Sequence, residues 1–236
     1  MSGEVYAAAA ACVALGAFIQ GTIGVGFALI VVPVFAFLDR DLLPAGVLAL
    51  MIPLNVYVIW RERLSIDWIG AKWITLGRLV GTLGGILILA ALAPRELNVL
   101  IGIVTVLAAG VTLVAPHFDP GRKTLLTGGL IAGIAETATG VGGPPMALLY
   151  QHQPAPMLRA TVASCFLIGQ VFSLVVLTVT GLTSLRQITA AALLLPALAV
   201  GGIASQVLHR RLDGPWLRVS VLLFAAASGL ALIVWG

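Results

Sequence analysis

Long apolar runs, separated by short polar or turn-forming breaks, fill almost the whole chain. A bilayer span needs about 20 apolar residues, and eight segments come close to or exceed that length: 5–37, 43–60, 66–93, 97–115, 124–150, 157–180, 188–208 and 215–235. No break between them is long enough to fold independently. We therefore predict an all-α polytopic membrane protein with about eight hydrophobic segments and no soluble domain.

Composition supports the bilayer as solvent. Hydrophobic residues make up 60% of the chain and charged residues 9%, whereas soluble domains carry about 25% charged residues. The few polar residues could not coat the surface of a soluble core of this size. We expect a multi-pass protein of the bacterial inner (cell) membrane, with the lipid bilayer as its first partner. The 13 Lys and Arg residues are scattered between apolar stretches, which is typical of membrane-flanking anchors and predicts no nucleic-acid partner.

The first segment, 5–37, is too long for a simple span, because a straight helix of that length would measure about 50 Å against a hydrocarbon core of about 30 Å. A glycine cluster, Gly21-Thr22-Ile23-Gly24-Val25-Gly26, lies in its middle. The fifth segment contains a similar run of helix-breaking residues, Thr139-Gly140-Val141-Gly142-Gly143-Pro144-Pro145. We predict that both segments are broken or re-entrant at these Gly-rich loops.

The two breaks belong to an internal repeat. Sliding the chain along itself places Glu136 on Gln20, Gly-Val-Gly on Gly-Val-Gly, and Gln170 on Asn55. This predicts two homologous four-segment repeats, 1–118 and 119–236, within one integral membrane domain. Internal repeats with interrupted helices in corresponding positions are typical of secondary transporters, whose substrate lies near the midplane between the halves.

The topology of the repeats depends on the breaks. If all eight segments cross, the repeats are parallel; if the first and fifth are hairpins, each half crosses three times and the repeats are inverted. The over-long first segment favours hairpins. With eight crossings, the Lys and Arg counts used to orient membrane proteins balance, with Arg61, Arg63, Arg122, Lys123 and Arg186 on one side and Arg40, Arg95, Arg159, Arg210 and Arg211 on the other.

Several motifs resemble the sulfite exporter TauE/SafE family, also called the toluene sulfonate uptake permease group. They are the Gly-rich first segment ending Val32-Pro33, the second copy ending Gly142-Gly143-Pro144-Pro145, and the start Asp67-Trp68 followed by a Gly81-x-x-Gly84 helix. The resemblance covers nearly the whole chain. It implies a secondary transporter of small anions, often sulfur-containing, such as sulfite or sulfonates, and it assigns no role to Arg78.

The breaks are also candidate binding elements on physical grounds. Glycine lets backbone approach a ligand, Pro144 suits the first turn of a new half-helix, and two helix N-termini aimed at the midplane attract an anion. The alternative is that the glycines only permit tight helix crossing. The substrate-binding candidates at the breaks are Gln20, Gly21, Thr22, Gly24, Gly26, Phe27, Thr137, Thr139, Gly140, Gly142, Gly143, Pro144 and Met146.

Two charged residues lie well inside apolar segments. Glu136 is a candidate for carrying a coupling proton, because intramembrane carboxylates are costly and default to a functional role; the alternative is a structural acid with a backbone or basic partner. Arg78 is a further substrate-binding candidate. Its guanidinium either binds an oxyanion bidentately, pairs with Glu136, or snorkels to the interface.

The remaining polar residues give weaker signals. Asn55 and Gln170 are candidates for secondary polar lining or for bridging helices. Cys12 and Cys165 lie in apolar runs and are interpreted as packing residues rather than a disulfide. The three histidines, His117, His152 and His209, fall in loops without metal-ligand spacing, so we expect no metal, no cofactor and no enzymatic activity.

Together these features predict a secondary transporter of small, sulfur-bearing anions. It would work by alternating access around a midplane site, with Glu136 as a candidate for proton coupling and protons as a candidate partner. A passive anion channel and a non-catalytic membrane assembly subunit remain alternatives, and homo-oligomer formation stays open.

Overall fold

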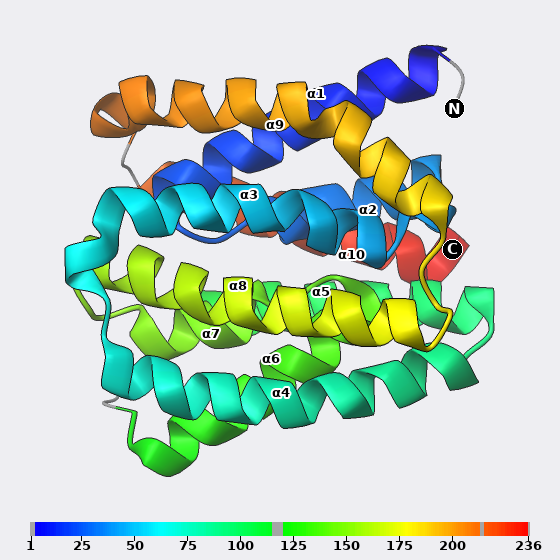
Figure 1. Ribbon diagram of the computed structural model, residues 1–236. Coiled ribbons are helices and arrows are strands. Elements are labelled where there is room, and N and C mark those ends of the chain that lie inside the picture. The colour runs from blue at the N-terminus through cyan, green and yellow to red at the C-terminus, as the bar shows by residue number, and fades with distance from the viewer. Residues whose placement is uncertain (1–2, 115–119, 213–214, 236) are drawn as a thin grey trace.

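The computed structural model describes residues 3–114, 120–212 and 215–235. Within these ranges the chain is helical and contains no strand, which confirms the all-α prediction (Figure 1). The helices are α1 (Gly3–Ile23), α2 (Phe27–Leu38), α3 (Ala45–Glu62), α4 (Trp68–Ala91), α5 (Pro94–Val114), α6 (Arg122–Thr139), α7 (Gly143–Tyr150), α8 (Ala155–Val179), α9 (Leu185–Leu212) and α10 (Pro215–Trp235), with 3-10 turns at Arg40–Leu42 and Arg63–Ser65.

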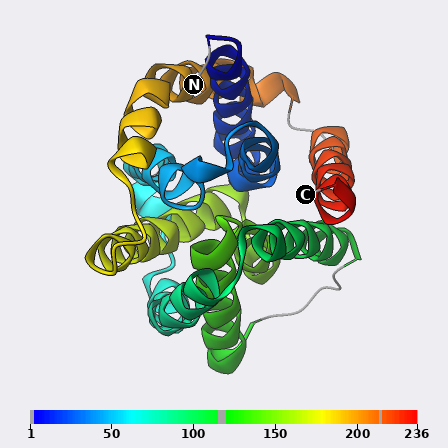
Figure 2. The same ribbon diagram turned by 90° about the vertical axis from the view of Figure 1, so that its right-hand side faces the viewer.

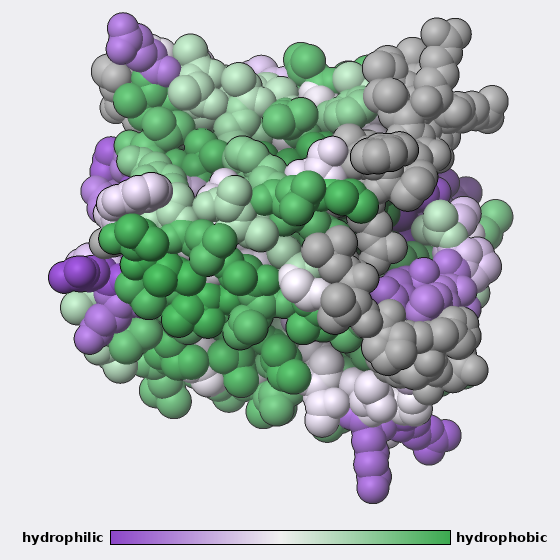
Figure 3. All heavy atoms as spheres, turned by 180° about the vertical axis from the view of Figure 1, so that it is seen from behind, coloured by the Kyte–Doolittle hydropathy of each residue, from purple (hydrophilic) through white to green (hydrophobic). Residues whose placement is uncertain are grey.

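Six stretches of the described chain are long and apolar enough to cross a membrane: Gly3–Ile23, Ala45–Ser65, Trp68–Ala91, Pro94–Val111, Ala155–Val179 and Leu185–Gln206. Helix α2 is shorter, and α6 carries three charged residues, Arg122, Lys123 and Glu136. The exact number of eight segments therefore stays a prediction. Figure 3 shows hydrophobic side chains across the middle of one face, with hydrophilic ones towards two opposite edges, as a bilayer requires.

The first break turns the chain back on itself. Gly24 and Gly26 have φ values of 95° and 130°, a region that residues with a Cβ rarely adopt. Helix α2 then packs antiparallel on α1, because the Cys12 Sγ lies 3.8 Å from the Ile30 carbonyl oxygen. A continuous helix would hold these two residues far apart.

The second break has the same form. Gly140 ends α6 with φ 83°, and α7 returns along α6 so that Leu149 lies against Gly128. Both predicted interruptions are thus confirmed, and both segments are hairpins rather than kinked spans.

The helix pairings stay the same when α1 to α5 are exchanged, in order, with α6 to α10. Helix α1 packs on α9 at one edge of the molecule and α6 packs on α4 at the opposite edge, while α3 packs on α8 between them and α5 on α10. Each half contains one hairpin and therefore crosses the bundle an odd number of times. As a result, each of the helices α6 to α10 runs in the opposite direction to its counterpart among α1 to α5 (Figure 1). Figure 2 shows the same helices from the end at which both termini lie.

Small residues allow the closest of these pairings. A Cβ at Gly77 or Gly81 of α4 would collide with the carbonyl oxygens of Leu126 and Leu130 on α6. Glycine at these two positions therefore lets the backbones of α4 and α6 approach closely. Gly84 is less restricted, since its nearest neighbour would be a side-chain atom at 3.4 Å.

The hairpins also separate the charges. One end of the bundle, here called the basic end, carries the connections after α3, α5, α7 and α9, and the terminal end carries those after α2, α4 and α8 and both chain termini (Figure 1). Positions at or near the basic end hold nine of the 13 Lys and Arg residues: Arg61, Arg63, Lys72, Arg122, Lys123, Arg159, Arg210, Arg211 and Arg218. The terminal end holds three: Arg40, Arg95 and Arg186. The balanced count assumed eight crossings, and the two fold-backs overturn it.

Candidate functional site

A buried ion pair joins the two halves. Arg78 of α4 donates from Nη2 to Oε2 of Glu136 on α6, and each side chain is 1% exposed. The guanidinium also lies over the Phe166 ring, 4.6 Å from its centroid. Among the alternatives for Arg78, snorkelling is wrong because the side chain is enclosed by protein, and pairing with Glu136 is confirmed.

Two amides extend this pair into a chain. Gln170 on α8 donates from Nε2 to Glu136 Oε1 at 2.9 Å, and Asn55 on α3 donates from Nδ2 to Gln170 Oε1 at 2.9 Å. Both amides are fully buried. They therefore bridge helices, which was one of the two alternatives for these residues. They also hold in place the carboxylate that pairs with Arg78.

A hydroxyl cluster lies next to the ion pair. Ser173 Oγ is 3.1 Å from Thr82 Oγ1 and 3.0 Å from Thr137 Oγ1. Thr137 follows Glu136, while Thr82 and Ser173 come one turn after Arg78 and Gln170 on their helices. Sequence reasoning found Thr137 but missed the other two; the signal was their helical spacing from residues already selected.

The ion pair lies directly behind the second break. A Cβ on Gly142 would be 2.6 Å from the Glu136 Cβ, so only glycine fits between the carboxylate side chain and the start of α7. Next to it, a Cβ on Gly143 would lie 4.0 Å from the Val25 Cβ of the first break. The two breaks therefore adjoin each other, with the ion pair on the far side of Gly142.

The starts of α2 and α7 are closed in different ways. The Phe27 N–H donates to Gln20 Oε1 at 3.2 Å, so this N–H is not free for an anion in the present state, contrary to our expectation. Pro144 and Pro145 occupy the first turn of α7, as predicted. The Thr139 hydroxyl donates to the Ala135 carbonyl and accepts from Val141 N–H, which stabilises the turn.

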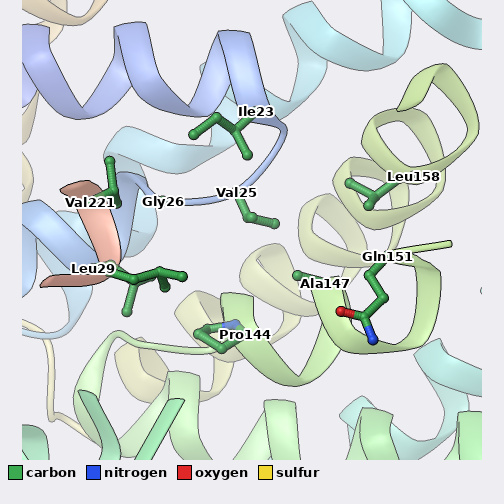
Figure 4. A pocket seen from close by; sticks show the side chains of 10 residues that line it. Ile23, Val25, Gly26, Leu29, Pro144, Ala147, Gln151, Leu158 and Val221 are labelled. Carbon is green, nitrogen blue, oxygen red and sulfur yellow. The ribbon is translucent and has the colours of Figure 1, made fainter. Parts of the chain in front are cut away.

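A cavity of about 130 Å³ lies between the two breaks (Figure 4). Val25 of the first break faces Pro144 and Ala147 of α7 across it. Its lining is mostly apolar: Ile23, Val25, Gly26, Leu29, Pro144, Ala147, Gln151, Leu158, Val221 and Leu222. Gln151 and Leu158 belong to the basic end, so the cavity extends towards that end.

Only some predicted binding residues reach this cavity. Gly26 and Pro144 line it. The remaining candidates do not: Gln20, Gly21, Thr22, Gly24, Phe27, Arg78, Thr137, Thr139, Gly140, Gly142, Gly143 and Met146. Most of them are buried behind its wall. The apolar lining was missed because single Leu, Ile and Val residues look alike throughout a membrane sequence.

A second ion pair ties the basic end together. Arg159 at the start of α8 donates from Nε and Nη2 to the Glu62 carboxylate at 2.7–3.0 Å, and Arg61 Nη2 reaches the Gly21 carbonyl at 3.4 Å. The Arg159 stem also contacts Gly24. This cluster, which sequence reasoning missed, connects α3 and α8 to the first break.

Within residues 3–114, 120–212 and 215–235, no group of three or more His, Cys, Asp or Glu residues could hold a metal ion. Cys12 and Cys165 are free and buried. His117 lies outside the described residues, as does the side chain of His209.

Comparison with known proteins adds the family. No curated protein and no solved structure gives a significant match. A family model described as sulfite exporter TauE/SafE matches residues 8–232, a range that contains both breaks, the buried ion pair and every cavity residue. The match covers nearly the whole chain, and together with the apolar helices it identifies an integral, multi-pass membrane protein of a transporter family. The chain belongs to the sulfite exporter TauE/SafE family.

Proposed function

We propose that this protein is a secondary transporter of small sulfur-bearing anions, such as sulfite or organosulfonates. The family supports membrane transport of this kind. The observation that carries the proposal is that α2 and α7 begin side by side at one cavity, with Arg78 behind the start of α7. Helix N-termini and a buried guanidinium both favour an anion.

The cavity suits a small solute. Its volume of about 130 Å³ is well above the about 10–15 Å³ that one water needs. None of its lining residues is an acid that could bind a cation, while the dipoles of the two helix starts favour an oxyanion. A sulfonate, with an apolar group beside its oxygens, matches this combination of surfaces.

We propose alternating access of two inverted repeats, 1–118 and 119–236. The exchangeable helix pairing supports this division. So does the hydrogen bond between Asn55 and Gln170, which occupy corresponding positions of the two halves and meet where α3 crosses α8. In transporters of this type the substrate lies at the repeat interface, near the bilayer midplane.

We propose that the basic end faces the cytoplasm of a bacterial cell and that both termini lie outside. Nine Lys and Arg positions at one end against three at the other support this orientation, since cytoplasmic loops carry the excess. The cavity then extends towards the cytoplasm, from which an exporter takes its cargo.

Glu136 is the proposed carrier of a coupling proton. It is the one acid of the described residues that lies far from both ends of its bundle, and it is buried against Arg78. Protonation would release the guanidinium. A passive channel would lack this coupling, so flux that saturates and follows a pH gradient separates the two functions.

A thermal-shift screen tests the proposal. The purified protein is heated with sulfite, sulfate, thiosulfate, methanesulfonate or acetate, and a ligand at 100 times its Kd should stabilise the fold by about 2.7 kcal/mol. We expect the sulfur anions to raise the midpoint. Ala147→Leu, which fills the cavity, should abolish this rise, whereas Ala199→Leu, which faces a separate groove between α3 and α9, should retain it. The absence of a shift with every sulfur anion would contradict the proposal.

A further inference from the structure

Arg78 is incompletely satisfied. Its Nη2 bonds to Glu136, but Nε and Nη1 have no hydrogen-bond partner within the described structure, although the side chain is 1% exposed. An unpaired buried donor is unfavourable, and more so when it is charged. The free donors are therefore a place where a ligand would gain binding energy.

The geometry of a guanidinium explains why this site is closed at present. It can bind an oxyanion bidentately through two edges, Nε with Nη2 or Nη1 with Nη2. Both edges include Nη2, the nitrogen that Glu136 occupies. Nη2 carries one N–H on each edge, so its bond to Glu136 closes one edge, and the carboxylate charge beside it disfavours an anion at the other.

We propose that Glu136 is a tethered counter-anion that competes with the transported anion for Arg78, so that anion binding requires uptake of one proton by Glu136. This inference rests on the proposed function and assigns how its site is regulated. Between transport events the carboxylate neutralises the guanidinium. The substrate takes over the Nη2 edge that Glu136 occupies only when the carboxylate has been protonated and has released it.

Charge balance sets the number of protons. The Arg78–Glu136 pair is neutral, and a monovalent anion added to it would leave one uncompensated negative charge in a buried place, which is strongly unfavourable. Uptake of one proton from the compartment that the cavity faces converts Glu136 to the neutral acid and restores neutrality. Gln170 still holds the side chain through Nε2, so the protonated acid has a defined position.

Among the groups around Arg78, Glu136 is the one that can take up the proton that compensates the charge of the anion. From α4 it faces Arg78; from α8 it faces Gln170, with the Cys165 thiol close to the guanidinium. Asp67, at the start of α4 and at the basic end, accepts a hydrogen bond from the Tyr150 hydroxyl. From α7 it meets the backbone at Gly142, and α3 contributes Asn55 through Gln170. The charged residues of α5, Arg95 and Glu96, lie at its terminal-end start.

Isothermal titration of the full chain in lipid nanodiscs tests the competition. Methanesulfonate is the probe because it remains ionised, so any proton taken up belongs to the protein. Titrations in two buffers of different ionisation enthalpy count those protons. We expect one proton per anion for the wild-type chain. Glu136→Gln should bind with no proton uptake and about tenfold more tightly, because the competitor is gone.

A matched control and three outcomes make the test decisive. Glu96→Gln changes an acid that caps Ala93 N–H at the surface and should behave as the wild type does. Wild-type binding without proton uptake, or weaker binding by Glu136→Gln, would overturn the competition and leave anion transport intact. If neither methanesulfonate nor sulfite binds to the wild type or to Glu136→Gln, the proposed function fails as well. The wild-type proton count needs no variant, so it stands even if Glu136→Gln folds poorly.

Discussion

Arg78 on α4 and Glu136 on α6 form an ion pair with each side chain 1% exposed. A buried ion pair seldom stabilises a fold more than apolar residues of similar size would, because both charges lose their hydration. The presence of this ion pair is better explained by a role in function than by a contribution to stability. The pair lies where the close packing of α4 on α6, between the two halves, meets the second break, so the same glycines that bring α4 onto α6 also bring the two charges together.

Breaking this pair should cost more than removing it. Arg78→Gln leaves a buried carboxylate without a cation and should lower the free energy of unfolding by about 3–5 kcal/mol. The double variant Arg78→Gln/Glu136→Gln should recover most of that loss. Denaturation in detergent, followed by tryptophan fluorescence, measures both. Losses that simply add in the double variant would show that the two side chains are not coupled.

The α4–α6 contact depends on glycine at particular positions. Gly81→Ala should destabilise the protein by about 1–3 kcal/mol, because its Cβ would meet the Leu130 carbonyl. Gly84→Ala is the matched control on the same helix, since its Cβ would only touch the Ile134 side chain at 3.4 Å. Melting temperatures of the two variants compare them directly. Equal losses would argue against the packing described here.

Much of this architecture follows from the sequence, because a few residue types have narrow roles in lipid. The glycine runs near Gly24 and Gly140 predict breaks, since an over-long apolar segment has to turn somewhere and backbone leaves a helix most cheaply at glycine. The direction of the chain after each break is harder to predict. It depends on packing such as that of Ile30 on Cys12, which hydropathy does not encode. The Lys and Arg count was balanced because it assumed that the chain continues across the membrane after each break.

The first break should tolerate no side chain at Gly24. A residue with a Cβ is strained at φ 95° and would also displace Arg159, loosening its ion pair with Glu62. Gly181→Ala isolates the conformational part, because Gly181 has φ 74° but no described atom near its Cβ position. We expect a loss of about 1–2 kcal/mol for Gly181→Ala and a clearly larger one for Gly24→Ala, as measured by thermal unfolding. A smaller loss for Gly24→Ala would contradict the Arg159 contact.

The orientation can be tested with two single cysteines at helix starts. Ala155→Cys on α8 lies at the basic end and Leu185→Cys on α9 at the terminal end, and both positions are exposed. The native Cys12 and Cys165 are buried and should contribute little background. In intact cells a membrane-impermeant maleimide should label Leu185→Cys and spare Ala155→Cys. The reverse pattern would place the basic end outside.

The candidate site was partly predictable for a different reason. Charged residues inside apolar segments are rare, so Glu136 and Arg78 stand out, and their pairing was one of the alternatives. Thr82 and Ser173 were missed because hydroxyl side chains bond to their own helix as readily as to a neighbour, and only the tertiary contact distinguishes them. The cavity lining is ordinary apolar sequence, so no local pattern marks it.

Flux into proteoliposomes tests the central claim most directly. Wild-type protein, reconstituted at known density, should take up radiolabelled sulfite or methanesulfonate with saturable kinetics, faster when an imposed pH gradient drives protons in the same direction. Arg78→Gln/Glu136→Gln, confirmed as folded by its melting transition, should lose this uptake, whereas Ala199→Leu should keep it. Uptake that neither saturates nor responds to the pH gradient, or that persists in the double variant, would contradict a proton-coupled anion transporter built around this pair.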